Sequence, residues 1–228
     1  MRVFYFTDFF FPNMSGIATA IGNLSAGLAK RGHKITIFAP KVPNNSYRAQ
    51  HSDIDLQYIS SIPSGIPDAY ISFPPFGRLS KYFKQFPPDI VHVQSEFIVG
   101  MVGILMAKLK KKPLVGNFHG YLSFGNLGIP KMEFIETFFF KYVVFSLNRC
   151  DAVVSPAKLG IHDLQKYGLK RPIHFIPNCV DEDEFKTVDS EKVELLKQKY
   201  GLRKNVVLYI GRMAKEKSID VLLQSFAL

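Results

Sequence analysis

Short apolar runs alternate with longer amphipathic stretches along almost the whole chain. The short runs are rich in Val, Ile, Phe and Tyr, as buried parallel strands are, and they predict strands near residues 2–7, 34–39, 55–60, 89–94, 113–118, 151–155, 172–176 and 205–210. The stretches between them predict helices near residues 16–31, 78–86, 96–111, 131–149, 157–168, 189–200 and 217–228. This alternation requires right-handed crossovers, so it predicts an α/β fold with a Rossmann-like parallel sheet covered on both faces.

Glycine and proline mark where these elements end. Gly32, Gly168 and Gly201 follow basic or long side chains at predicted helix ends, where glycine suits the left-handed conformation of a C-terminal cap. The stretch from Pro40 to Pro88 is rich in proline and breaks the alternation. We expect its middle to be extended or looped, as a flap over a ligand cleft.

The two ends of the chain share one arrangement, in which a strand, a short loop and a helix follow each other. Ser15-Gly16 follow the first strand, and Gly211-Arg212 follow the last. Such units present backbone N–H groups to an anion in Rossmann-like domains. We therefore predict two domains facing each other across a cleft. The first covers residues 1–175, and residues 176–228 hold a hinge and the first βα unit of an incomplete second domain.

The charge of the chain narrows the class of partner. The chain has 228 residues, and 47% of them are apolar, which indicates a globular protein rather than a disordered one. Its formal net charge is +10. The positive charge predicts attraction to nucleotide phosphates, anionic lipid or nucleic acid, without choosing among them. Because no nucleic-acid-binding motif is recognisable, we do not expect a nucleic acid as partner.

Cysteine usage and hydropathy indicate the compartment. Cys150 and Cys179 lie far apart and form no CxxC pair, so neither a disulfide framework nor a zinc site is expected, and a reducing cytoplasm fits. No apolar run reaches the ~18 residues of a membrane span. The N-terminus is interpreted as a first strand and not as a signal peptide, because Thr7-Asp8 interrupt its apolar stretch.

Three loops carry the candidate chemistry. In the first, Ser15-Gly16 precede a helix, and Gly16 can take a positive φ that lets the backbone approach a ligand. A tight turn without function is the alternative interpretation. The dinucleotide fingerprint GxGxxG is absent, which disfavours NAD or FAD, and no cofactor is expected.

The second loop follows the strand near 113–118. His119 at its carboxyl end is expected in the crevice where doubly wound sheets bind ligands. Its imidazole can donate a hydrogen bond to a developing negative charge or act as a general base. His92, inside the preceding strand, is interpreted as a satisfied core residue. Glu96 lies in a strand-to-helix turn and either caps the helix or orients a substrate hydroxyl.

In the third loop, two cations lie at a predicted helix start. Arg212 follows the strand, and Lys217 is expected in the first helical turn. Cations are unfavourable beside the positive end of a helix dipole unless an anion is bound, so this pair predicts an anion site.

These loops belong to a longer series of segments that resembles a known family. The series, in order, consists of Ser15-Gly16, Ala29 to Thr36, Pro88 to Val93, Phe118-His119-Gly120, Cys150 to Ser155, Ile176 to Asp181, and Gly211-Arg212 with Glu216-Lys217. In this order and spacing it resembles the retaining glycosyltransferases of family 4, which have the GT-B fold. Two positions depart from the family pattern, because Cys179 and Ser218 stand where the family usually has glycine.

The resemblance implies a hexose transfer from a UDP- or GDP-sugar, with an N-terminal acceptor-binding domain and a C-terminal domain for the nucleotide sugar. Gly16, with Ser15, would lie near the donor diphosphate, and His119 beside the transferred sugar as the catalytic residue. Arg212 and Lys217 would neutralise the leaving nucleoside diphosphate, and Glu96 would contact the acceptor. No metal is expected. The family's two paired Glu would fall beyond Leu228, so we expect this chain to be inactive alone.

The resemblance also bears on the acceptor. The segments Gln94 to Phe97, Ser61 to Phe76 and Phe134 to Phe145 are similar to those of members that glycosylate membrane lipids such as diacylglycerol or phosphatidylinositol. The positive charge suits docking on an anionic bilayer, so we expect a cytoplasmic protein that associates peripherally with the inner face of the cell membrane. A soluble sugar acceptor and a non-catalytic binding half-protein remain as alternatives.

The surface expected to dock carries basic residues beside aromatic ones on two predicted helices, which is what the membrane interface selects. The aromatic residues are Phe73, Phe76, Tyr82 and Phe83, and the basic residues are Arg78, Lys81, Lys84, Lys108, Lys110, Lys111 and Lys112. The alternative is an ordinary solvated face whose rings pack inward.

Overall fold

A computed structural model gives the fold of the chain. It describes residues 1–13, 15–43, 45, 47–65, 69–120, 133–180, 182, 186, 188–203, 205–211, 213 and 217–226. The chain divides into two compact units: one holds the described residues up to Cys179 and the other those from Val180 onward. In the predicted hinge, which begins at residue 176, residues 181, 183–185 and 187 lie outside the described residues.

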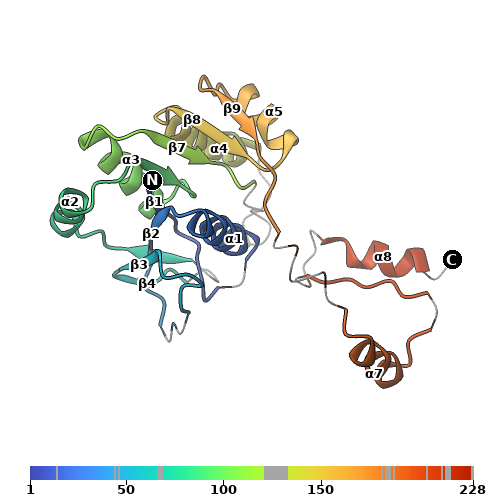
Figure 1. Ribbon diagram of the computed structural model, residues 1–228. Helices are drawn as coiled ribbons and strands as arrows, with labels where there is room; N and C mark the ends of the chain where they lie inside the picture. Colours follow the sequence, from blue (N-terminus) through green and yellow to red (C-terminus); the bar gives the residue numbers. More distant parts are fainter. Residues whose placement is uncertain are drawn as a thin grey trace. The chain divides into compact units, whose positions relative to one another are not determined.

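The first unit is built on one parallel sheet of seven strands in the order β3-β2-β1-β6-β7-β8-β9 (Figure 1). Every neighbouring pair is parallel, which confirms the predicted α/β fold. The strands are β1 (Arg2–Phe6), β2 (Lys34–Pro40), β3 (Ile54–Ile59), β6 (Ile90–Val93), β7 (Leu114–Asn117), β8 (Ala152–Ser155) and β9 (Ile173–Phe175).

Helices cover the two faces of this sheet because side chains alternate along each strand. α1 (Gly16–Lys30) packs on one face, where Ile21 lies in a core with Tyr5 and Ile37. Buried residues of the other helices form a second core with Phe4 and Phe6 on the opposite face. These helices are α2 (Phe76–Gln85), α3 (Ile98–Leu109), α4 (Glu133–Leu147) and α5 (Lys158–Lys166).

The order of the strands reverses next to β1. The chain runs outward from β1 to β3 on one side, and from β6 to β9 on the other. The carboxyl ends of β1 and β6 therefore flank the topological switch point, where open α/β sheets bind their ligands. This point sets where a functional site is to be sought.

The structure adds an element inside the stretch that was expected to be extended or looped. β4 (Ser61–Pro63) and β5 (Tyr70–Ser72) pair as an antiparallel hairpin, with Ile62 opposite Ile71. Pro63, the last residue of β4, does not prevent this pairing, because both strands of a two-stranded sheet are edge strands, where proline is tolerated.

Glycine caps occur where they were predicted. Gly32, Gly168 and Gly201 have φ values of 80°, 96° and 60°, and each follows the last turn of a helix. Their N–H groups donate to carbonyls of that turn, from Gly32 to Ala29 at 2.8 Å for example. These contacts satisfy carbonyls that the helix itself leaves without partners.

The second unit contains α7 (Ser190–Tyr200) and α8 (Ile219–Phe226) among its described residues. The prediction of a strand at 205–210 is wrong in this structure, because these residues adopt no strand. A strand requires a neighbour for its hydrogen bonds, and no described residue of this unit pairs with them. No helix in the described part of the chain is long and apolar enough to cross a bilayer.

Candidate functional site

Polar side chains gather at the carboxyl edge of the sheet beside the switch point. Asp8 follows β1, Gln94 follows β6, and His119 follows β7 by two residues. Asn117, the last residue of β7, lies on the same face of the sheet as His119 because side chains alternate with a period of two. Three neighbouring strands therefore contribute to one site.

The imidazole of His119 lies in a compact amide cluster. Its Nε2 is 2.8 Å from Gln94 Oε1 and 3.0 Å from Asn117 Nδ2. Asn117 Nδ2 in turn donates to Gln94 Oε1 at 2.9 Å. Gln94 is 2% exposed and Asn117 7% exposed, whereas His119 is half-buried. The cluster thus holds the inner nitrogen of a ring that still reaches solvent.

Burial determines the charge of this ring. It lowers the pKa of His119 to about 4, because a protonated imidazole is poorly solvated there. His119 is therefore neutral near pH 7, with one ring nitrogen protonated and the other carrying a lone pair. Such a ring donates one hydrogen bond through its protonated nitrogen and accepts one through the other, and the tautomer decides which nitrogen does which.

His92 differs from the prediction. Its ring packs edge-on against Tyr5 with the centroids 5.3 Å apart, but its enclosed Nε2 has no hydrogen-bond partner among the described residues. The interpretation of His92 as a satisfied core residue is therefore wrong. Burial, with a smaller contribution from His119, lowers the pKa of His92 to about 3, so this ring is also neutral.

Asp8 organises the start of α3. Its carboxylate accepts from Ser95 Oγ at 2.6 Å and from the N–H groups of Val99 and Gly100 at 2.9 and 3.2 Å. These N–H groups belong to the first turn, which has no partners within the helix. Burial raises the pKa of Asp8, while these hydrogen bonds oppose that rise. This role of Asp8 was not predicted from the sequence, although Thr7-Asp8 directly follow the first strand.

Glu96 lies in the turn between β6 and α3, as predicted, but it does not cap the helix. The capping carboxylate is that of Asp8, and Phe97 precedes α3 without a side-chain bond. The Glu96 carbonyl accepts from the Tyr142 hydroxyl at 2.5 Å. Its enclosed Oε1 has no partner among the described residues. Burial, and secondarily the charge of Asp8, raise the pKa of the Glu96 carboxyl to about 8.

Ser15 and Gly16 lie at the start of α1. The Ser15 hydroxyl accepts from the Ala18 N–H at 3.1 Å and so caps the helix. Gly16 is exposed, and a Cβ there would have nothing within 4 Å. A positive φ was predicted as possible for Gly16, but the residue does not adopt one. It is the first residue of α1, and helical residues have negative φ. The helix start is nevertheless open to a ligand.

The cations of the third loop are only partly described. Arg212 lies outside the described residues. Lys217 is exposed and precedes α8 by two residues, so the prediction of Lys217 in the first helical turn is wrong. Ser218 has a φ of 49°, which interrupts the helix and favours glycine. Glycine is the residue that the family resemblance places at this position.

No three His, Cys, Asp or Glu side chains come together as a metal site would require within the described ranges. The residues that sequence reasoning missed are Gln94, Asn117 and Asp8. Period-two alternation on the strand of His119 could have identified Asn117. The contact of Gln94 with His119 and that of Asp8 with the start of α3 depend on which strands become neighbours.

Comparison with known proteins adds the family. Residues 14–184 match the family model described as Glycosyltransferase Family 4. The whole chain aligns at 29% identity with 52% of the alpha-monoglucosyldiacylglycerol synthase of Streptococcus pneumoniae. It is 22% identical to a GDP-mannose-dependent alpha-mannosyltransferase of Corynebacterium glutamicum, over 97% of this chain and 54% of that protein. The chain spans about half the length of these curated relatives.

Solved structures share the fold at low sequence identity. The Anabaena protein HepE, in complex with UDP and glucose, is 17% identical, and the match covers all of this chain and 57% of that one with a TM-score of 0.71. WaaG, a glycosyltransferase involved in lipopolysaccharide biosynthesis, is 14% identical, with 100% and 59% coverage and a TM-score of 0.59. Such likeness establishes the predicted fold of the first unit, the Rossmann-like N-terminal domain of GT-B proteins.

Proposed function

We propose, since the chain belongs to glycosyltransferase family 4, that the full-length protein transfers a hexose from a nucleotide-diphosphate sugar to a membrane lipid, with retention at the sugar carbon. The observation that carries this proposal is the alignment of the entire chain, at 29% identity, with an alpha-monoglucosyldiacylglycerol synthase. A second such synthase, from Acholeplasma laidlawii, aligns at 26% over 99% of the chain.

The first unit supplies groups suited to this chemistry. The open start of α1, with Ser15 and Gly16, offers N–H groups to the donor diphosphate. His119 contacts the transferred sugar as the catalytic residue, and its neutral ring suits hydrogen bonding to a hydroxyl. Glu96, protonated near pH 7, contacts the acceptor through its carboxyl group, whose Oε1 has no partner among the described residues.

The second unit contributes Arg212 and Lys217 in this proposal. Departure of a nucleoside diphosphate leaves negative charge on the phosphates, and fixed cations stabilise that charge in the transition state. Lys217 is exposed and so available for such a role. Ser218 beside it holds a backbone conformation that brings the chain to the start of α8.

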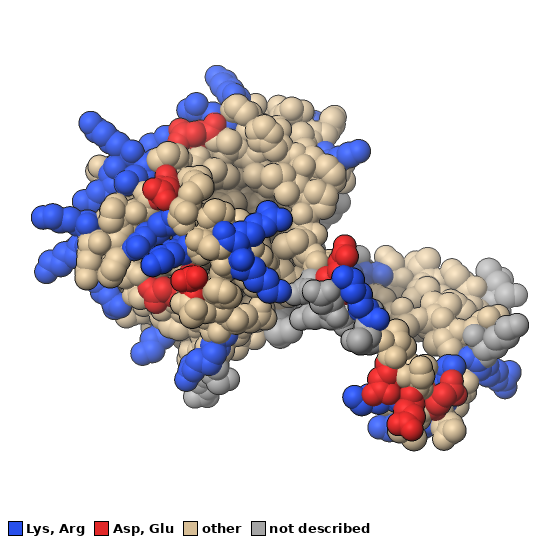
Figure 2. All heavy atoms as spheres, in the orientation of Figure 1, with Lys and Arg blue, Asp and Glu red and all other residues tan. Residues whose placement is uncertain are grey.

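The first unit also has a surface suited to an anionic bilayer, at the inner face of the cell membrane. Ile62, Ile71, Phe73 and Phe76 are exposed on the β4–β5 hairpin and at the start of α2. Arg78, Lys81 and Lys84 are exposed further along α2. Figure 2 shows Lys and Arg projecting from the side of the unit where Figure 1 places α2. Cations and rings together are favoured at a lipid headgroup layer.

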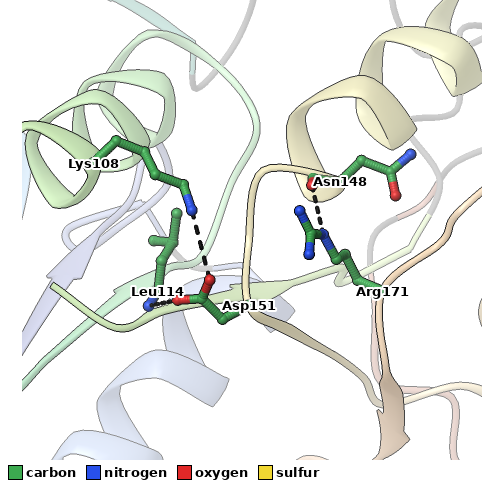
Figure 3. Close-up of polar contacts among 5 residues, drawn as sticks. All are labelled: Lys108, Leu114, Asn148, Asp151 and Arg171. Atoms are coloured by element: carbon green, nitrogen blue, oxygen red, sulfur yellow. Dashed lines mark hydrogen bonds and ion pairs between the residues drawn. The ribbon is translucent and has the colours of Figure 1, made fainter. Parts of the chain in front are cut away.

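Some residues of the predicted docking set lie elsewhere. Phe83 is 3% exposed and packs on Phe4, and the ring of Tyr82 contacts Phe4 and Phe38, so these two rings belong to the core. Lys108 turns toward the Asp151 carboxylate at 3.5 Å, as Figure 3 shows. By contrast, Lys110 donates to Ser80 at 2.7 Å and so brings the end of α3 beside α2. We name Ile62, Ile71, Phe73, Phe76, Arg78, Lys81 and Lys84 the α2 surface.

A transfer assay on a full-length protein containing this chain tests the proposal. UDP-glucose and GDP-mannose serve as donors, with diacylglycerol in vesicles or a soluble sugar as acceptor. We expect lipid-linked product, and a loss of ~10²-fold or more in turnover for His119→Ala. His162→Ala, on the exposed face of α5, is the control and should retain turnover.

Two outcomes of this assay decide among the alternatives. Product only on the soluble sugar would replace the lipid acceptor. No product with any donor would favour a non-catalytic binding protein. The isolated 228-residue chain should transfer no hexose, because its curated relatives are almost twice as long, and transfer by it would contradict that expectation.

A further inference from the structure

The three atoms at the centre of the amide cluster impose a constraint on hydrogen positions. His119 Nε2, Gln94 Oε1 and Asn117 Nδ2 lie 2.8, 2.9 and 3.0 Å apart pairwise. A neutral imidazole nitrogen carries either a proton or a lone pair, never both. Hydrogen atoms can therefore satisfy two of these contacts, and the third remains unsatisfied.

The orientation of the two amides distinguishes the two possibilities. If Nε2 carries a proton, Gln94 Oε1 accepts from His119 and from Asn117, which satisfies the two shortest contacts. If Nε2 carries a lone pair, that lone pair faces those of Gln94 Oε1. The contact between Nε2 and Oε1, at 2.8 Å, then becomes repulsive. The amide orientations of the structure thus favour the protonated Nε2.

Because the two amides are buried, the wrong tautomer of His119 would be energetically costly. Gln94 and Asn117 are almost fully enclosed, and water does not reach them to relieve a mismatched contact. Asn117 is the last residue of β7, and Gln94 directly follows β6, which pairs with β7. The rigid sheet therefore holds both amides in place beside the half-buried ring.

We infer that Gln94 and Asn117 are positioning residues that hold His119 in the Nε2–H tautomer. Nδ1 then carries the lone pair and is the nitrogen that a ligand meets. It accepts a hydrogen bond from a hydroxyl of the transferred sugar, and it does not donate to a developing negative charge. The ligand role rests on the proposed function, whereas the tautomer is a property of the unliganded chain.

Nitrogen NMR of the 228-residue chain, with ¹⁵N-labelled histidine and no nucleotide sugar, tests this inference. Long-range ¹H–¹⁵N correlations distinguish the protonated from the unprotonated ring nitrogen of each of the six histidines, and His119→Phe assigns the signal. We expect Nε2–H as the major form in the wild type. A major Nδ1–H form would overturn the inference, because Nε2 would then carry the lone pair that faces Gln94 Oε1.

Substitutions of Gln94 make the test specific. Gln94→Met keeps the length of the side chain and removes the acceptor, so the preference for Nε2–H should fall by about fivefold, the effect of one hydrogen bond. Gln94→Glu retains an acceptor and should restore the preference. Gln57→Met, the same change on β3, is the control. An unchanged tautomer in folded Gln94→Met would refute the inference, whether or not the full-length protein transfers a hexose.

Discussion

At the residue scale, burial sets the protonation states along the carboxyl edge of the first sheet. It lowers the pKa of both His92 and His119, because each cationic ring would lose hydration. It raises the pKa of Glu96 for the same reason, since here the anion is the form that loses hydration. At neutral pH His92, His119 and Glu96 are therefore present mainly as uncharged hydrogen-bonding groups.

Glu96 makes the stability of the first unit depend on pH. Below about pH 4.5 its carboxyl group is protonated in the folded and the unfolded chain, and its contribution is fully present. Between that value and about 8 only the unfolded chain releases the proton, so the contribution is lost as pH rises through this window. Glu96→Gln has no such loss.

We therefore expect the free energy of unfolding of Glu96→Gln, relative to wild type, to be higher at pH 8.5 than at pH 5 by at least about 1 kcal/mol. Urea unfolding followed by circular dichroism at the two pH values measures this difference. The same difference between variant and wild type at both pH values would mean that the carboxyl is solvated.

At the scale of single elements, the start of α3 is determined by close backbone contact. A Cβ on Gly100 would lie 1.7 Å from the Ser95 carbonyl oxygen, and one on Gly103 would lie 2.6 Å from Phe6. Glycine at these positions lets the helix approach β1 and β6. The approach brings the first-turn N–H groups within reach of Asp8.

Gly100→Ala should therefore destabilise the first unit by more than about 3 kcal/mol, since the clash is with backbone and no side chain can move away. Gly27→Ala is the matched helical control: nothing lies within 4 Å of its added Cβ. That substitution should stabilise α1 by about 0.5–1 kcal/mol. Thermal unfolding of both variants measures these changes in stability. Equal changes in the two variants would show that α3 does not contact the Ser95 backbone as closely as the structure has it.

At the scale of the whole molecule, the net charge of +10 acts through its distribution. Lys108 is compensated by Asp151, whereas the α2 surface combines exposed cations with exposed apolar side chains. Phe134, Phe138 and Phe145 on α4 are also exposed, Phe138 at 75%. A docking surface that combines basic and aromatic residues thus stays a prediction, and it now involves fewer residues than the sequence alone suggested.

Sedimentation with vesicles tests the α2 surface. The chain should bind anionic vesicles more strongly than neutral ones, and salt should weaken the binding through screening. Lys81→Glu/Lys84→Glu should lose most of this binding, at ~1 kcal/mol for each surface cation. Arg31→Glu/Lys34→Glu changes the net charge equally at exposed positions that do not belong to the α2 surface and should bind better than the first variant. If both variants lost vesicle binding equally, the binding would depend on net charge and not on the α2 surface.

The sequence by itself determined the alternation of strands and helices, the glycine caps at Gly32, Gly168 and Gly201, and the position of His119 at a strand end. Each of these depends on residues within a few positions of one another, so local periodicity and backbone preference suffice. Tertiary structure alone decided that Gln94 and Asn117 meet His119, that Asp8 caps α3, and that Phe83 packs inward while Phe76 stays exposed. These contacts join residues up to 92 positions apart, and they exist only because the strand order of the sheet makes β1, β6 and β7 neighbours.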